Sequence, residues 1–374
     1  MTRAMVYLPD RSGASDGRGG PGPLAEVELD VLEIGPAQVV MPEATIRDER
    51  DGALFTGPDP SAELVFDPAA GGGPWAGAAA DRSARAFGLV NTAFHTQRTL
   101  RYVSKLLGHP LPHLLIRIGM HEQQRRWSGG HYRLPGHGAG ADPEATSPAG
   151  EIHLGGGAGF VVRPDTHRYF RVPAHNPAII CHEVGHHVCR HTADFRLNQL
   201  RPPRQQTNKK TALDEGTADL ITAIQLGTPD IYGWHRHTIP DTHQRRRKLD
   251  PRWTMAHFHG GPDSDPHADG MVWASACWSA RQRITDTGAD PTRFDTLLLH
   301  GMELAGHDHP ADLSSDALRE RRHFSRLMTA MAQADPALAP HVIAAMAEHG
   351  IHPGVSNNDL SRAARTNPNR LVNE

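Results

Sequence analysis

The chain of 374 residues has only three cysteines: Cys181, Cys189 and Cys277. So small and odd a number does not make a disulfide framework. Cys181 and Cys189 are eight residues apart on one expected helix, about 12 Å along its axis, which is too far for a bridge. We therefore expect all three cysteines to be buried as small apolar residues.

Long apolar runs are also missing. No stretch of 18 apolar residues occurs, which argues against a transmembrane helix, and the first ten residues lack the apolar segment of a signal peptide. These absences predict a cytoplasmic protein without a membrane partner. Secretion remains the alternative, because a chain trimmed of its signal would look the same.

Lysine is scarce, with four residues against 35 arginines, and the net charge is only −3 with histidine neutral. A chain without a strong positive balance is not expected to bind nucleic acid or an anionic membrane. Its 37 glycines and 30 prolines predict long irregular connections between the helices and strands.

Histidine, by contrast, is abundant, with 26 residues. Residues 176–191 contain the pattern His-Glu-x-x-His, formed by His182, Glu183 and His186. The asparagine and proline that open this stretch suit the N-cap and first position of a helix. On a helix, His182 and His186 are about one turn apart, so they can share a metal ion with Glu183 beside it. In so His-rich a chain, an amphipathic helix with exposed histidines is the alternative.

A second expected helix, residues 211–227, carries the candidate third ligand. Thr211 can cap this helix and Gly227 can end it. Glu215 and Asp219 are four residues apart and share a face, so Glu215 can bind the metal while Asp219 accepts a hydrogen bond from a ligand histidine. The alternative is a solvent-exposed acidic face. We favour the ligand interpretation because that face has no basic partner at three or four residues.

Two other zinc schemes fail on spacing. A metzincin needs a glycine and then a histidine at the positions that Cys189 and Thr192 occupy. The aspzincin pattern Gly-Thr-x-x-Asp is missed by one residue at 216–219. Only the scheme with a glutamate as the third ligand fits. It requires two helices in close contact, which Gly185 and Gly216 would allow.

A third element follows at residues 265–280. Asp269 can cap a helix that begins near Gly270. His267 lies just before that helix, where its side chain can point into a cleft. The alternative for so common a residue type is an ordinary loop histidine.

The three motifs together resemble those of the gluzincin metallopeptidases, in particular the thermolysin and fungalysin types. The order is His-Glu-x-x-His, then Asp-Glu-x-x-x-Asp on a second helix, then His-x-Asp-Gly before a third. The resemblance covers roughly residues 85–305. It implies an α+β zincin-type catalytic domain, with a small mixed sheet, a zinc helix and a helical C-terminal lobe, which follows a small β-rich N-terminal region. It also implies Zn²⁺ as the cofactor and a peptide or protein as the substrate.

The resemblance assigns a role to each matched residue. Zinc is bound by His182, His186 and Glu215. Glu183 is the general base and His267 stabilises the oxyanion, while Asp219 matches the acid that orients a ligand histidine.

Some positions depart from the family pattern. The family has an aspartate about five residues before its late histidine, where this chain has Pro262. Either Asp263 or Asp265 must therefore orient His267. The family's additional active-site tyrosine has no counterpart that can be aligned.

Two segments are candidates for substrate binding. Residues 151–155 alternate as a strand, and in zincins the edge strand before the zinc helix holds the substrate backbone. An ordinary edge strand is an equally good interpretation of the alternation. The basic run 245–248 contains Arg246, the best match to a family arginine that contacts the substrate. We favour the alternative that this run is simply exposed to solvent. The candidates are Ile152, His153, Leu154 and Arg246.

The expected organisation is a β-rich region at 1–80, an N-terminal lobe with both motif helices at 81–230, a mainly helical C-terminal lobe at 231–353 and a polar, frayed tail at 354–374. The sequence thus predicts a zinc metallopeptidase. Two alternatives are a zincin-fold hydrolase dedicated to one peptide or natural-product precursor, and a non-catalytic metal-binding scaffold. The oligomeric state is not predicted.

Overall fold

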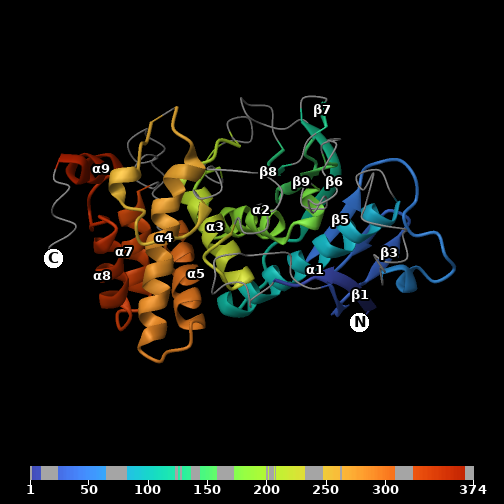
Figure 1. Cartoon of the computed structure of the whole chain (residues 1–374), viewed down its shortest axis with the longest axis horizontal. Helices are drawn as coiled ribbons and strands as arrows, with labels where there is room; N and C mark the ends of the chain where they lie inside the picture. The colour runs from blue at the N-terminus through green and yellow to red at the C-terminus, as the bar shows by residue number, and fades with distance from the viewer. Residues whose placement is uncertain are drawn as a thin grey trace, which may run out of the picture.

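The computed structural model describes residues 2–9, 24–64, 82–122, 125–126, 129–135, 144–157, 172–198, 201, 206, 208–231, 247–261, 263–307 and 323–366. These residues form an α+β protein, as the sequence predicted. Strands gather in the N-terminal half of the chain and helices in the C-terminal half, with helices α2 and α3 between them (Figure 1). No helix in this described part is long and apolar enough to cross a bilayer.

One mixed sheet contains seven of the described strands, in the order β3-β4-β5-β6-β9-β8, with β7 paired to β6. Strands β5, β6 and β9 run parallel to one another, while β8 is antiparallel to β9. The strands are β3 (Glu33–Gly35), β4 (Gln38–Val40), β5 (Ala44–Asp48), β6 (Leu114–Glu122), β7 (Arg125–Arg126), β8 (Gly130–Arg133) and β9 (Glu151–Gly155).

Strand β9 lies inside the sheet, so the prediction that it is an edge strand is wrong. Ile152 pairs with Ile116 of β6 on one side and with Tyr132 of β8 on the other. All five residues of β9 are buried. Because its backbone groups already face a strand on each side, Ile152, His153 and Leu154 cannot pair with a substrate backbone. Strand β8 ends the sheet order and is the edge strand instead.

The N-terminal strands do not form a unit of their own. Among the described residues, only the hairpin of β1 (Thr2–Tyr7) and β2 (Leu24–Leu29) makes a separate sheet. Strand β5 pairs with β6, so the main sheet crosses the boundary that was expected near residue 80. Helix α1 (Arg82–Leu107) packs on both β1 and β5.

The two motif helices begin and end where the sequence predicted. In α2 (Pro177–His191) the Asn176 side chain accepts a hydrogen bond from the Ala178 N–H at 2.9 Å. In α3 (Ala212–Leu226) the Thr211 hydroxyl accepts one from the Asp214 N–H at 3.2 Å. Gly227 ends α3 with a left-handed φ of 70°. These caps satisfy backbone groups that the helices leave unpaired.

Gly185 and Gly216 both lie at close contacts between helices, but only Gly185 lies between α2 and α3 as expected. A Cβ on Gly185 would lie 2.8 Å from Ala218 Cα, so α2 and α3 touch at this point. A Cβ on Gly216 would lie 2.3 Å from the carbonyl oxygen of Gly270. Gly216 therefore serves the contact of α3 with α4 (Pro266–Asp286) and not its contact with α2.

Helix α4 begins four residues earlier than expected. Its N-cap is Asp265, whose carboxylate accepts a hydrogen bond from the His267 N–H at 3.0 Å. Asp269 is not the cap: it is buried in the first turn and accepts two backbone N–H groups of the preceding loop, at 2.7 and 2.8 Å. His267 is consequently a residue of the first helical turn, and its direction is fixed by that turn.

The C-terminal half is a bundle whose apolar core includes Trp273 and Phe324 and continues into α1, α2 and α3. Part of the tail that was expected to be frayed is a helix, because α9 buries Leu360 and the Ser361 hydroxyl donates to the Phe258 carbonyl at 2.7 Å. The remaining helices are α5 (Thr292–His307), α7 (Phe324–Ala334), α8 (Ala339–Glu348) and α9 (Asn357–Thr366).

Candidate metal centre

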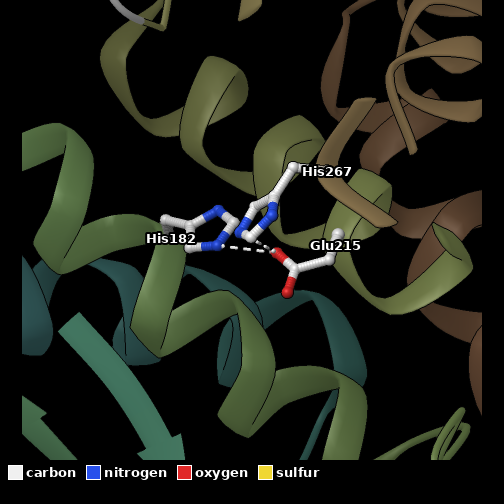
Figure 2. Close-up of side chains that lie close together, drawn as sticks. All are labelled: His182, Glu215 and His267. Atoms are coloured by element: carbon white, nitrogen blue, oxygen red, sulfur yellow. Dashed lines mark ion pairs between the residues drawn. The ribbon is translucent and has the colours of Figure 1, made fainter. Parts of the chain in front are cut away.

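Four side chains from α2, α3 and α4 converge on one point. The Nε2 atoms of His182 and His186 are 3.2 Å apart. Glu215 Oε2 lies 3.0 Å from His182 Nε2 and 3.4 Å from His186 Nε2. The Nε2 atom of His267 is 3.2 Å from the same carboxylate oxygen. Figure 2 shows His182, Glu215 and His267 turned toward one another, and these three form a group that could hold a metal ion.

The spacing of these atoms fits a divalent cation. Ligand bonds of about 2.0–2.1 Å in a tetrahedral site place neighbouring ligand atoms about 3.3 Å apart. The Glu215 carboxylate is fully buried: Lys210 Nζ lies 3.0 Å from its Oε1, while Oε2 has no hydrogen bond of good geometry to any described residue. A buried carboxylate that faces ring nitrogens is stabilised when a cation lies between them. Imidazole nitrogen and carboxylate oxygen are ligands that zinc accepts.

His182 and His186 each have an acidic partner on α3. His182 Nδ1 lies 2.8 Å from Asp219 Oδ1, and His186 Nδ1 lies 3.1 Å from Asp214 Oδ1. Such partners fix the ring orientation, so that Nε2 is the nitrogen that faces the centre. Asp219 was predicted for this role. Asp214 was not, because the sequence gives no sign of which side chain on α2 it would meet.

The charges around the centre keep the acids ionised. Burial alone would lower the pKa of His182, but Asp219 and Glu215 outweigh it and raise that pKa to about 9. Burial raises the pKa of Asp219, whereas Arg247 and His182 lower it to about 2. Burial likewise opposes the ionisation of Glu215, but Lys210 and His186 hold its pKa well below the ordinary value. A metal ion bound here would have to displace the proton of His182, so binding would release a proton.

Glu183 lies beside the centre with an unused carboxylate oxygen. It is 3% exposed, and its Oε2 has no hydrogen-bond partner among the described residues. Burial opposes its ionisation, but Lys210 and His182 outweigh burial and lower its pKa. A Cβ on Gly130 would lie 2.7 Å from Glu183 Cγ, so the edge strand β8 packs directly on this side chain. Glu183 is thus an ionised carboxylate with a free acceptor.

A cavity of about 240 Å³ lies next to the centre. Gly130 and His131 of β8 form one wall, while Ile179 of α2 and Ile231 supply apolar surface. A concave, partly apolar space with a few convergent polar groups is typical of a ligand-binding site. The polar residues around it are His131, His182, Glu183, Lys210, Asp219, Thr222, Arg247 and His267.

The basic run contributes Arg247 to this cavity. Its Nε atom donates to Asp219 Oδ2 at 3.1 Å, and its Nη2 atom also donates to the Asp219 carboxylate. The same Nη2 atom lies 3.3 Å from His182 Nδ1. Arg246, the predicted substrate contact, lies outside the described residues. The sequence could not distinguish the two neighbours, because a run of basic residues has no periodicity.

Of the two acids left open by the sequence, the structure pairs Asp265 with His267. Asp265 Oδ1 lies 3.0 Å from His267 Nδ1, while Asp263 is exposed. The His267 ring is stacked near that of His182, with a centroid separation of 6.0 Å, and its side chain is 34% exposed. His267 therefore lies at the rim of the centre, and Asp265 fixes the orientation of its ring.

Lys210 is a further polar residue that the sequence did not identify. Its Nζ atom lies 3.0 Å from Glu215 Oε1. It comes from the irregular segment before α3, where neither helix nor strand periodicity predicts the direction of a side chain.

Comparisons with known proteins add little to this geometry. A scan against protein-family models finds no match, and a search of curated proteins finds none either. Among solved structures, the chain is similar to the precursor of protealysin, a metalloproteinase from Serratia proteamaculans. The sequence identity is 12%, the TM-score is 0.39, and the match covers 71% of this chain and 78% of that one. Superposition at this score is loose, so the description of the site depends on this chain alone.

Proposed function

We propose that the protein is a zinc-dependent metallopeptidase. The observation that carries this proposal is the convergence of His182, His186 and Glu215, whose facing atoms lie between 3.0 and 3.4 Å from one another. The ionised Glu183 carboxylate lies beside them on the wall of the same cavity. Three protein ligands with a base next to them are the arrangement of a hydrolytic zinc site.

Zinc bound by these residues would lower the pKa of a water molecule from about 15.7 toward ~7. Glu183 would accept a proton from the attacking water and later pass it to the leaving amine of the cleaved bond. This role agrees with its unpaired Oε2 atom and its lowered pKa. Gly130 of β8 restricts the carboxylate to one side of the cavity.

Two other parts of the site would act on the substrate. His267, oriented by Asp265, donates a hydrogen bond to the carbonyl oxygen of the substrate as that oxygen becomes negatively charged. One such donor is typically worth about 3–4 kcal/mol. The edge strand β8 has one side without a paired strand in the described sheet, so it can hold an extended peptide by backbone hydrogen bonds. This assigns to β8 the role that the sequence had suggested for β9.

The test is the substitution Glu183→Gln. The variant should keep its zinc, because Glu183 is not among the ligands, and should lose activity by a factor on the order of 10²–10⁴. Metal analysis of protein purified without added zinc checks the first point. A chelator-sensitive assay on a broad peptide library, read by mass spectrometry, checks the second. Glu348→Gln, an exposed glutamate in α8, is the control.

The outcomes separate the candidate functions. If the zinc-loaded variant hydrolyses peptides at the parent rate, Glu183 is not the base. If the zinc-loaded parent cleaves no member of the library, the alternative of a hydrolase dedicated to one precursor is favoured. If purified parent protein binds no zinc and cleaves nothing, the proposed function is wrong.

A further inference from the structure

Lys210 acts on the two carboxylates that matter most to the proposed reaction: it pairs with Glu215 and its charge influences Glu183. Its Nζ atom is 3.0 Å from Glu215 Oε1, and its positive charge is the largest influence that lowers the pKa of Glu183. The side chain is only 16% exposed. Burial of an ammonium group is unfavourable unless acceptors compensate it, so this position requires the negative charges beside it.

The position of Lys210 differs from that of the other cations around the centre. Arg196 is paired with Asp214, and Arg247 is held by Asp219. Lys210 is paired with Glu215 and lines both the 240 Å³ cavity beside the metal ligands and a second cavity of about 600 Å³, whereas Arg247 lines only the first of these two. A substrate that extends from one cavity into the other would therefore pass the ammonium group.

Apart from His131 and His267, the described residues that line the first cavity offer few other side-chain donors. Arg247 donates to Asp219, and the Thr222 hydroxyl donates to the Ala218 carbonyl at 2.8 Å. Among the described residues that line this cavity there is no tyrosine, asparagine or glutamine. An ammonium group has three N–H donors, and among the described residues Lys210 forms one ion pair, with Glu215.

We propose that Lys210 is a catalytic residue whose ammonium group donates a hydrogen bond to the substrate oxygen that becomes negatively charged, together with His267. This inference rests on the proposed peptidase function. Lys210 transfers no proton: it is an ammonium before and after the reaction, and one N–H stays on Glu215 Oε1. A charged donor directed at developing charge stabilises the transition state more than the ground state.

The experiment uses cobalt(II)-loaded protein and two probes that bind at the metal. Acetohydroxamate binds as an oxyanion, whereas imidazole is neutral, and the visible spectrum of cobalt reports both. Lys210→Met should weaken acetohydroxamate binding about tenfold and leave imidazole binding nearly unchanged. Lys210→Arg, which keeps the charge, should lie between the parent and Lys210→Met. Lys209→Met is the matched control, since Lys209 lines only the second cavity.

Activity and metal affinity complete the test. On a peptide that the parent cleaves, Lys210→Met should lower kcat on the order of 10²-fold with little change in KM. Acetohydroxamate binding equal to that of the parent would overturn the inference. So would a large loss of cobalt affinity, because Lys210 would then only position Glu215. If the parent itself binds no metal, the proposed function fails and this inference fails with it.

Discussion

His267 could act at the centre in either of two ways. Its Nε2 atom is 3.2 Å from Glu215 Oε2, as close as the nitrogens of the α2 histidines, so it could be a fourth ligand. Two observations favour the role of an oxyanion donor. Its side chain is 34% exposed while His182 and His186 are buried, and its outer partner is Asp265, a cap residue at the surface. A catalytic zinc also needs one position open to water.

Substitution of His267 by alanine distinguishes the two roles. We expect His267→Ala to keep the metal content of the parent and to lose a factor on the order of 10²–10³ in kcat, because one oxyanion donor is removed. Metal analysis and peptide kinetics on the same preparation provide the measurement. His259→Ala is the control, since that histidine lies in the preceding loop and is mostly exposed. Loss of metal from His267→Ala would make His267 a ligand.

Single residues also show which parts of the site could be predicted from the sequence. His182, His186, Glu215 and Asp219 stand at helical spacing, and spacing alone places each pair on one face. Asp214 was not predicted as a partner, because it meets His186 across the contact of two helices, 28 residues apart in the chain. A pairing of this kind depends on how the helices cross, which a periodic pattern does not specify.

Helices were predicted better than strand order. The caps of α2 and α3 are local signals, so their ends follow from neighbouring residues. In α4, Asp265 and Asp269 are both suitable caps by residue type, and Asp265 is used because loop N–H groups occupy Asp269. Strand β9 alternates as an edge strand would, yet it is covered on both sides by β6 and β8. Its place depends on pairings with segments far away in sequence.

The contact of α2 with α3 determines where Glu215 meets His182 and His186. A substitution at this contact therefore tests whether the helix pair positions the ligands. In Gly185→Ala the added Cβ would lie 2.8 Å from Ala218 Cα, so one of the two helices must shift. Alanine favours a helix by about 1 kcal/mol over glycine, but overpacking should cost about 1–3 kcal/mol. We expect a net loss of stability and at least a tenfold weaker affinity for the metal, measured by chelator competition.

A control must separate loss of stability from displacement of the ligands. Ile284→Val removes a methyl group from the buried part of α4, at a typical cost of about 0.5–1.5 kcal/mol. It should lower the unfolding midpoint and leave metal affinity as in the parent. Equal metal affinity in the Gly185→Ala protein would show that the close approach of α2 and α3 does not position Glu215.

At the scale of the whole molecule, the abundance of histidine affects stability as well as chemistry. Several histidines are buried as neutral hydrogen-bond donors to backbone carbonyls. His95 Nε2 lies 2.9 Å from the Tyr7 carbonyl oxygen and joins α1 to β1, and His175 Nε2 lies 2.7 Å from that of Ala84. Burial lowers the pKa of His95 to about 3 and that of His175 to about 4. Both side chains therefore resist protonation in the folded protein.

Because of these two histidines, we expect the folded protein to lose stability in mild acid. Their folded pKa lies below the unfolded value of about 6.5, so the unfolded chain binds more protons at any pH between the two. The stability they contribute is present above pH ~6.5 and declines as the pH falls toward 4. At pH 5 each should have lost about 2 kcal/mol, as an upper estimate. Urea unfolding at pH 7 and pH 5 measures the difference.

The substitutions His95→Gln and His175→Gln test the origin of this effect. Glutamine keeps an N–H donor for the carbonyl but cannot take up a proton in this range, so each variant should be less stable than the parent at pH 7 and lose less between pH 7 and pH 5. Carboxylates such as Asp219, whose pKa is lowered to about 2, contribute mainly below pH 4.5, outside this window. If the double variant shows the same pH dependence as the parent, other groups cause the loss. In that case the burial of neutral His95 and His175 is not what makes the protein less stable at pH 5.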